Sequence, residues 1–177
     1  MIQEAKKNLA KIIFEKKYIS GIYDKRLFNN FLEDANNFLF LLPGNDKDFK
    51  YAFDIVKYFQ IHKKEVTLFL PEYAINLIID SRKYKFLGYG VKDINKLGLP
   101  SKSLINTLKE LSFDVVVDLN RSENLFFIAV AHLVKAKYRI GFLRENINAH
   151  YNVQLVNKKI NAEITYRNLL NSLKMFY

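Results

Sequence analysis

Short apolar runs alternate with longer amphipathic stretches along most of the chain. The apolar runs suit strands that are buried within a sheet, and the intervening stretches place apolar residues at helical spacing. We expect strands over residues 38–42, 65–70, 84–87, 114–119, 138–142 and 153–156. We expect helices over residues 47–61, 71–81, 100–111, 122–135 and 163–175. Repeated strand–helix units of this length predict an α/β fold with a Rossmann-like, doubly wound, mainly parallel sheet of about five to six strands flanked by helices.

The first 36 residues follow a different pattern. Residues 3–17 form a predicted amphipathic helix with apolar side chains on one face and lysines on the rest, and a second short helix is expected over 25–33. We therefore divide the chain into a basic amino-terminal helical arm, residues 1–36, and a single Rossmann-like domain, residues 37–177, that ends in a carboxyl-terminal helix. A basic amphipathic helix can pack on its own domain, or lie on a membrane surface or a partner.

The most informative segment reads Phe113-Asp-Val-Val-Val-Asp-Leu-Asn120. Its unbroken valine run suits a strand that is covered on both faces, as in a parallel sheet. Asp118 and Asn120 then lie at the carboxyl end of that strand, on the edge where open α/β sheets bind ligands. The polar residues are therefore expected where function is expected.

The residues that follow this strand fit the start of a helix. Asn120 with Glu123 matches a capping box, and Ser122 is an alternative cap. A helix start beside a parallel strand end can also hold an anion such as a phosphate or a sugar acid, with Arg121 as a charged assistant. Capping and ligand binding are thus both open for this segment.

Composition narrows the class of protein. With 177 residues, of which 50% are hydrophobic and 15% aromatic, the chain can bury one substantial core. The absence of cysteine excludes disulfides, thiolate nucleophiles and zinc–thiolate sites, and fits a reducing compartment. The sequence shows no secretory leader and no apolar run long enough to cross a membrane, so we expect a cytoplasmic protein that can be membrane-peripheral through residues 1–17.

The formal net charge of +10 adds little to this picture. The excess is spread along the chain, mostly as lysine, which is typical of a solvated basic surface and leaves an acidic ligand or a membrane surface as alternatives. No basic–aromatic strand signature is present, so nucleic acid is not an expected partner. The charge points to no particular site.

Motifs for cofactors and metals are also missing. There is no Gly-x-Gly-x-x-Gly segment and no Walker-type loop, so no nucleotide cofactor is expected. Asp46-Lys47-Asp48 has the Asp-x-Asp form of a metal-binding pair, but at the start of a helix such carboxylates complement the helix dipole. We therefore predict no metal. The three histidines form no recognisable catalytic set.

The block from residue 113 to 142 resembles the amino-terminal half of the heptosyltransferase family, glycosyltransferase family nine. The resemblance rests on the strand that ends in Asp118-Leu119-Asn120, the small residues of the next helix, and the strand Lys135-Ala-Lys-Tyr-Arg-Ile-Gly-Phe142. It covers residues 37–175 more loosely. It implies the acceptor-side domain of a GT-B arrangement, in which a second Rossmann-like half holds the nucleotide-sugar donor.

Two departures from that family shape the functional expectation. The donor-binding half is not in this sequence, and the turn where the family has Gly-Asp, with a carboxylate implied to act as general base, reads Gly44-Asn45-Asp46. An amide cannot accept a proton at neutral pH, so only a one-residue shift would place Asp46 in that role. We expect a glycosyltransferase-like single domain without independent transferase activity, acting as a binding or partner-dependent module.

Two alternatives remain open. One is heptosyltransferase-like glycosyl transfer in lipopolysaccharide or cell-envelope glycan synthesis, by a truncated enzyme or one that a second chain completes. The other is a basic scaffold protein that binds a membrane or ribonucleoprotein surface. The partners considered are a carbohydrate or phosphorylated ligand, a protein partner and a homo-oligomer. The candidate residues are Asp46 for catalysis, and for ligand binding Gly44, Asn45, Asn120, Arg121 and Ser122.

Overall fold

Six parallel strands form the central sheet of the protein. The computed structural model describes residues 8–13, 15–16, 31–143, 151–156 and 161–177. The strands run in the order β3-β2-β1-β4-β5-β6, and every neighbouring pair is parallel. They are β1 (Asn37–Leu41), β2 (Glu65–Pro71), β3 (Lys85–Tyr89), β4 (Ser112–Asp118), β5 (Lys135–Phe142) and β6 (Val153–Leu155). The prediction of a doubly wound, parallel α/β sheet is confirmed.

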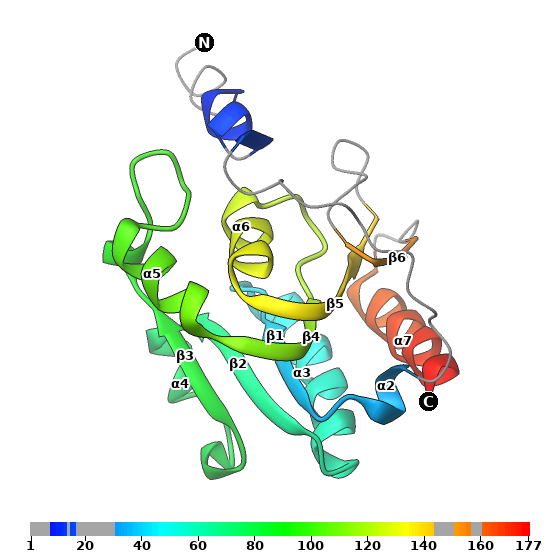
Figure 1. Ribbon diagram of the computed structural model, residues 1–177. Helices are drawn as coiled ribbons and strands as arrows, with labels where there is room; N and C mark the ends of the chain where they lie inside the picture. Colours follow the sequence, from blue (N-terminus) through cyan, green and yellow to red (C-terminus); the bar gives the residue numbers. More distant parts are fainter. Residues whose placement is uncertain (1–7, 14, 17–30, 144–150, 157–160) are drawn as a thin grey trace.

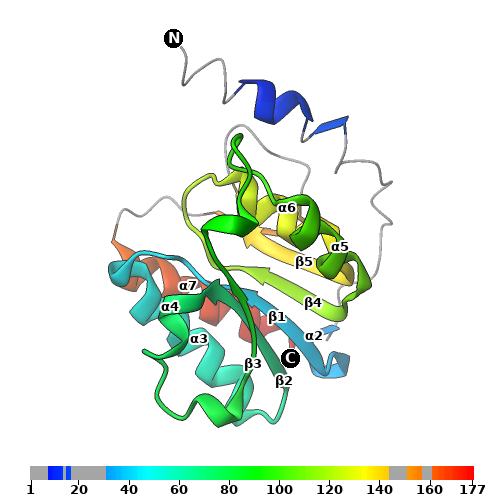
Figure 2. The same ribbon diagram turned by 90° about the vertical axis from the view of Figure 1, so that its left-hand side faces the viewer.

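Helices cover both faces of this sheet (Figures 1 and 2). One face carries α2 (Phe31–Asp34), α3 (Asp46–Ile61), α4 (Glu72–Ile75) and α7 (Ala162–Leu173). The other carries α5 (Lys102–Glu110) and α6 (Leu125–Leu133). Short 3-10 turns η1 (Ser81–Lys83), η2 (Val91–Asp93) and η3 (Lys174–Phe176) complete the described elements. In the part of the chain that the structure describes, no helix has the length and apolar character needed to cross a membrane.

The central strands explain the unbroken apolar runs of the sequence. Along β4, Val115 and Val117 pack in the core beneath α3 and α7, whereas Val116 packs in the core beneath α5 and α6. All three valines are fully buried. Because both faces of the strand are covered, neither face needs polar residues.

The amino-terminal segment is described only in part. Residues 8–13 and 15–16 are helical, and Ala10 is buried as a member of the apolar cluster to which α5 and α6 contribute. Leu9 and Ile12 are about half exposed on the same segment, at 49% and 51%. The rest of the helix expected over 3–17 lies outside the described residues.

The short helix α2 belongs to the main body of the protein. Phe31 and Leu32 are buried in the core that α3 and α7 cover, and the Phe31 ring lies 4.4 Å from that of Tyr138 on β5. Residues 25–30, where the expected second helix begins, lie outside the described residues. This core therefore draws apolar side chains from before the first strand.

The helix expected over residues 71–81 is wrong in its extent. Pro71 is the last residue of β2 and pairs with Tyr89, and α4 ends at Ile75. Further on, Asp80 adopts a left-handed conformation with φ of 58°, which a right-handed helix cannot include. The sheet and this backbone turn together leave room for only one helical turn.

The helix expected over residues 122–135 begins later, at Leu125. Its N-cap is Asn124, whose side-chain oxygen accepts a 3.0 Å hydrogen bond from the backbone N–H of Phe126. The predicted caps, Asn120 and Ser122, are therefore wrong. Asn120 is not available for capping because it is buried at the end of β4.

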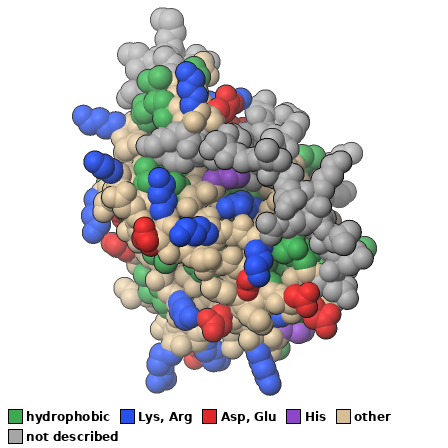
Figure 3. Space-filling model, in the orientation of Figure 1, with side chains coloured by type: hydrophobic (Ala, Val, Ile, Leu, Met, Phe, Trp, Pro, Cys, Tyr) green, Lys and Arg blue, Asp and Glu red, His purple; other side chains and the backbone are tan. Residues whose placement is uncertain are grey.

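Charged side chains are distributed over the molecular surface. On the face that Figure 3 shows, Lys and Arg side chains lie scattered over the surface, with Asp and Glu side chains between them. No single basic patch dominates this face. The distribution fits a solvated basic surface better than a continuous anion-binding track.

Candidate functional site

The order of the sheet reverses between β1 and β4. From β1 the chain passes through α3 to β2 on one side, and from β4 through α6 to β5 on the other. The β1–α3 turn (residues 42–45) and the β4–α6 loop (residues 119–124) therefore leave neighbouring strand ends in opposite directions. In open α/β sheets this switch point is the usual location of a ligand site.

Asp118 closes β4 with a fully buried carboxylate. One oxygen accepts hydrogen bonds from the backbone N–H and the side-chain amide of Asn120, at 2.9 and 2.8 Å. The other accepts a 2.5 Å hydrogen bond from the Tyr151 hydroxyl. The Asn120 amide also donates to the Leu41 carbonyl of β1 at 3.3 Å. These contacts fix the ends of β1 and β4 against each other.

Gly141 makes the approach of Tyr151 possible. A Cβ atom at position 141 would lie 2.9 Å from two ring carbons of Tyr151, closer than real side chains pack. The Tyr151 ring therefore lies directly on the backbone of β5, with its hydroxyl on Asp118. Only glycine leaves this space without moving the ring.

A largely buried ion pair joins the two diverging loops. Arg121 of the β4–α6 loop donates from Nε and Nη2 to Oδ1 of Asp48, at 2.9 and 2.6 Å. The side chains are 21% and 9% exposed, respectively, so the pair is shielded yet reaches the surface. Burial alone would lower the pKa of Arg121, but the contact with Asp48 outweighs it and raises the pKa.

Asp48 is itself positioned by the start of α3. Asn45 is the N-cap, and its side-chain oxygen accepts a 2.9 Å hydrogen bond from the Asp48 N–H. The Asn45 amide donates in turn to Asp48 Oδ2 at 3.2 Å. A carboxylate in the first turn also complements the helix dipole. Asn45, Asp48 and Arg121 therefore form one polar chain across the switch point.

Tyr166 brings α7 to the same place. Its hydroxyl donates a 2.6 Å hydrogen bond to the Leu119 carbonyl, and the guanidinium carbon of Arg121 lies 6.0 Å from its ring centroid. Burial raises the pKa of Tyr166 above that of an exposed tyrosine, so the hydroxyl stays a donor. The β4–α6 loop is thus held from β1, α3 and α7.

The predicted site residues divide into two groups. Asn45 and Arg121 meet through Asp48, and Asn120 is buried beside them. Gly44, Asp46 and Ser122 are exposed, and no atom lies within 4 Å of the place a Gly44 Cβ would occupy. The side chains of Asp46 and Ser122 make no hydrogen bond or ion pair with other described residues.

Three residues of the site were not predicted. Asp48 was considered only as half of the Asp-x-Asp pair, and Tyr166 lies in the helix expected over residues 163–175, for which no site role was predicted. Tyr151 lies outside every expected element. Local sequence carries no signal for these contacts, because each partner lies more than thirty residues away, at separations of 73, 47 and 33.

The described residues offer little to a metal ion. No group of three or more His, Cys, Asp or Glu side chains gathers among them. Of the Asp-x-Asp pair, Asp48 is bound to Arg121 and Asp46 is exposed. The chemistry that this site offers is hydrogen bonding and charge: a guanidinium, a carboxylate and an amide in one row.

Fold and site together define a Rossmann-like α/β domain whose buried polar groups gather at the switch point. The chain belongs to a family described as "Family of unknown function (DUF6913)", whose model matches residues 7–176. No curated protein matches it. Among solved structures, it is similar to a family 4 carbohydrate esterase from Bacillus anthracis, with 11% identity over 87% of this chain and 88% of that one. The TM-score of 0.33 is too low to establish a common fold.

Proposed function

We propose that this protein is a glycosyltransferase-like binding module that takes a carbohydrate or phosphorylated ligand at the β1–β4 switch point. In this proposal it acts alone or with a partner, without transferase activity of its own. The supporting observation is the Asp48–Arg121 pair, which places a shielded guanidinium and carboxylate where the sheet order reverses. Shielding an ion pair from water costs desolvation free energy. Its position at the edge of the sheet where ligands bind therefore suggests a functional role.

The groups of this row suit such a ligand. A guanidinium presents a planar fork of donors that matches phosphate and carboxylate oxygens. Asp48 accepts hydrogen bonds and Asn45 both donates and accepts, which is what sugar hydroxyls require. Asn45 is exposed and Arg121 reaches the surface, so a ligand can contact both.

The same geometry favours binding over transfer. At the turn where the family resemblance implies a general base, Asn45 uses its side chain to cap α3. The nearest buried carboxylate, Asp48, is engaged by Arg121. Neither group is placed to take a proton from an acceptor hydroxyl, because one is an amide and the other is already paired.

Ligand titrations followed by amide NMR test this proposal. The probes are glucose 6-phosphate, inorganic phosphate and methyl glucoside, which separate the sugar from the phosphate. We expect saturable shifts with glucose 6-phosphate in residues 42–46 and 119–124. Arg121→Gln should weaken binding about tenfold, whereas Arg82→Gln, at an exposed arginine of η1, should leave it unchanged.

Two results would reject the binding proposal. One is the absence of saturable shifts in these loops with all three probes. The other is equal affinity in the wild type and in a folded Arg121→Gln variant. Asp48→Asn provides a second check, because it keeps Arg121 while removing the carboxylate that pairs with it.

A catalytic alternative rests on Asp46. It is the first residue of α3, exposed at the switch point, and the member of the Asp-x-Asp pair that Arg121 does not engage. If a second chain supplies a nucleotide-sugar donor site, Asp46 could act as the base. Donor-dependent release of nucleotide that Asp46→Asn abolishes and Asp54→Asn preserves would favour transfer. Full activity in Asp46→Asn would remove Asp46 from the mechanism.

A further inference from the structure

A cavity of about 460 Å³ opens between α3 and the segment 77–84, which connects α4 to β3. This volume is in the range of small-molecule sites. Its lining shares α3 with the switch-point site, but none of the residues that form the row Asn45, Asp48 and Arg121. We call this cavity the α3 groove. It is separate from the proposed function in both residues and chemistry.

The α3 groove exposes large apolar side chains to solvent. Ile61, Leu77 and Ile79 line it with exposed fractions of 71%, 66% and 86%. Single exposed apolar residues are ordinary, but several around one concave site mark a surface that binds something. Their position on the rim leaves apolar area for a bound molecule to cover.

Aromatic rings build the floor at one end of the groove. The rings of Phe49 and Phe53 stack with centroids 5.9 Å apart. Phe53 also packs edge-on against Tyr84 at 5.6 Å. These contacts join α3 to the residue that precedes β3, so packed aromatic rings form this end of the groove.

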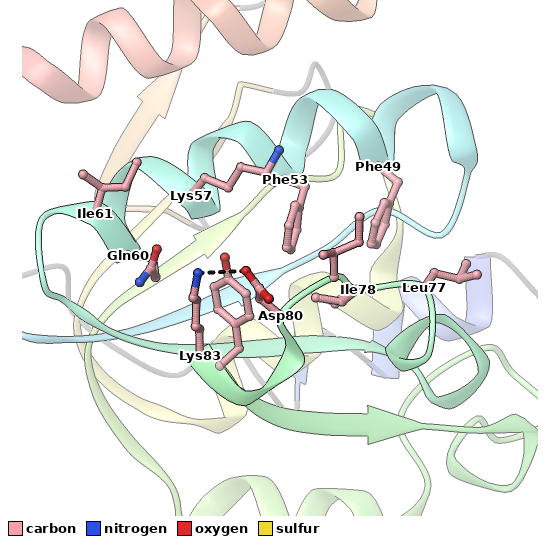
Figure 4. A pocket seen from close by; sticks show the side chains of 11 residues that line it. Phe49, Phe53, Lys57, Gln60, Ile61, Leu77, Ile78, Asp80 and Lys83 are labelled. Atoms are coloured by element: carbon pink, nitrogen blue, oxygen red, sulfur yellow. Dashed lines mark hydrogen bonds and ion pairs between the residues drawn. The ribbon is translucent and has the colours of Figure 1, made fainter.

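Polarity is segregated along the groove (Figure 4). Phe49, Phe53, Ile78 and Leu77 lie toward the amino-terminal end of α3. Lys57, Gln60, Asp80 and Lys83 lie toward the other end, where Ile61 beside Gln60 is the one apolar side chain that Figure 4 labels. From Phe49 to Lys57 the helix rises about 12 Å. An occupant of this groove therefore needs an apolar body of that length with one polar head.

The polar end carries positive charge for such a head. The lining contains the ammonium groups of Lys57 and Lys83 against one carboxylate, that of Asp80. Lys57 pairs with Asp54 at 3.0 Å and Lys83 with Asp80 at 2.8 Å, but all four side chains are more than half exposed, at 51–63%. Exposed pairs of this kind contribute little and yield readily to a competing anion.

The charges of Lys57 and Lys83 both act on the Tyr84 hydroxyl. Burial raises the pKa of the Tyr84 hydroxyl, and the charges of Lys83 and Lys57 oppose that rise. Tyr84 lines the groove, and its hydroxyl makes no hydrogen bond with other described residues. The Lys57 ammonium lies 5.5 Å from the Phe53 ring centroid and Lys83 lies on the opposite wall, so the two cations flank the groove from its two sides.

We infer that the α3 groove binds a medium-chain fatty acid, with the acyl chain over Phe49 and Phe53 and the carboxylate between Lys57 and Lys83. The apolar end offers the chain the exposed side chains of Leu77 and Ile79, which a bound chain would cover. The cationic end selects a carboxylate over an alcohol of equal length. Acetate, which lacks the apolar body, does not bind.

Isothermal titration of the full chain with decanoate, decanol, benzoate and acetate tests this inference, with amide NMR to locate the site. Decanoate should bind saturably and shift residues 49–61 and 77–84. Decanol should bind about tenfold more weakly, because it lacks the charge. Benzoate binding as tightly as decanoate would overturn the acyl assignment.

Two double variants test separately the contacts to the carboxylate and the contacts to the acyl chain. Lys57→Gln with Lys83→Gln should weaken decanoate about tenfold and leave decanol unchanged. Leu77→Ser with Ile79→Ser should weaken both ligands. The matched controls, Lys92→Gln with Lys102→Gln and Val91→Ser with Met175→Ser, change equally exposed residues outside the groove and should alter neither affinity.

Three outcomes would overturn the inference. These are the absence of saturable decanoate binding to the folded chain, affinities that neither groove variant changes, and shifts confined to another surface. A dimer in sedimentation velocity that Ile79→Ser dissociates would assign the groove to a second copy instead. If the Leu77, Ile79 double variant does not fold, Ile79→Ser alone replaces it, since that side chain is 86% exposed.

Discussion

The switch point and the α3 groove depart from the usual partition of residues in opposite ways. At the switch point polar groups are buried: Asp118 is fully inaccessible, and Asp48 and Asn120 are each 6% exposed. At the groove apolar groups are exposed, with Ile79 at 86%. Buried polar groups and exposed apolar clusters are the two departures that carry information about function.

The two regions differ in whether their side chains have partners within the protein. At the switch point the polar groups hold one another, since Asp118 accepts from Asn120 and Tyr151 and Asp48 accepts from Arg121. At the groove the apolar rim faces solvent instead. The switch point is therefore expected to lose stability when one of its side chains is removed. The groove is expected to gain stability when a bound molecule covers its apolar rim.

The largest effect is expected at Asp118. Asp118→Ala removes from a fully buried position the carboxylate that accepts hydrogen bonds from the Tyr151 hydroxyl and from two N–H groups of Asn120. We expect a loss of about 3–5 kcal/mol in the free energy of unfolding, measured by urea denaturation. Asp54→Asn, at an exposed carboxylate of α3, should change it by less than about 0.5 kcal/mol. Equal values for the two variants would contradict a stabilising network.

Alkaline pH should produce the next largest effect. Burial raises the pKa of Tyr89 and Tyr177 to about 12, and also raises that of Tyr166. The unfolded state loses these protons first, from about pH 10, so the stability that protonated tyrosine supplies is complete below that pH and is lost as pH rises further. The slope should reach at most about 1.4 kcal/mol per pH unit for each tyrosine.

Urea denaturation at several alkaline pH values measures this loss. Tyr166→Phe should be less stable than the wild type near pH 8, because the Leu119 carbonyl loses its donor. Its stability should then fall less steeply above about pH 10. Parallel curves for the two proteins would show that Tyr166 does not titrate differently on unfolding.

A smaller effect is expected for the ion pair. A double-mutant cycle with Asp48→Asn and Arg121→Gln should give a coupling energy of about 1 kcal/mol, because both groups are shielded from solvent. The same cycle on Asp54 and Lys57, which are more than half exposed, should give a value close to zero. Coupling of equal size in the two cycles would remove the distinction between shielded and open pairs.

The smallest effect on stability is expected at the groove. Leu77→Ser with Ile79→Ser should change the free energy of unfolding by less than about 0.5 kcal/mol, because these side chains are already in water. Urea denaturation of the ligand-free protein measures the change. A loss above about 2 kcal/mol would mean that these residues are part of the core, and the contrast between the two regions would fail.

Much of the fold follows from local pattern. The strand at 114–119 was predicted from its valines, and β4 occupies Ser112–Asp118. Strands that are buried on both faces and helices with one apolar face leave a clear periodicity. The errors lie where tertiary contacts decide: Asp80 takes a left-handed backbone, and Asn120 serves β1 instead of the helix that follows it.

The site was predictable only as a location. The strand-end rule led to Asp118 and Asn120, the helix-start argument led to Arg121, and all three lie at the switch point. Their partners Asp48, Tyr151 and Tyr166 come from distant segments, and a single sequence does not show which segments meet. The roles of Gly44, Asp46 and Ser122 stay predictions that the binding and transfer experiments address.

The glycine of the Arg-Ile-Gly strand has a consequence for how related sequences can vary. Because the Tyr151 ring occupies the space where a side chain at position 141 would be, any larger residue there would push the hydroxyl away from Asp118. Positions 118, 141 and 151 are therefore under a joint constraint. Across the family, we expect aspartate, glycine and tyrosine at these positions to be gained and lost together, so that covariation among homologues records a contact that no single sequence reveals.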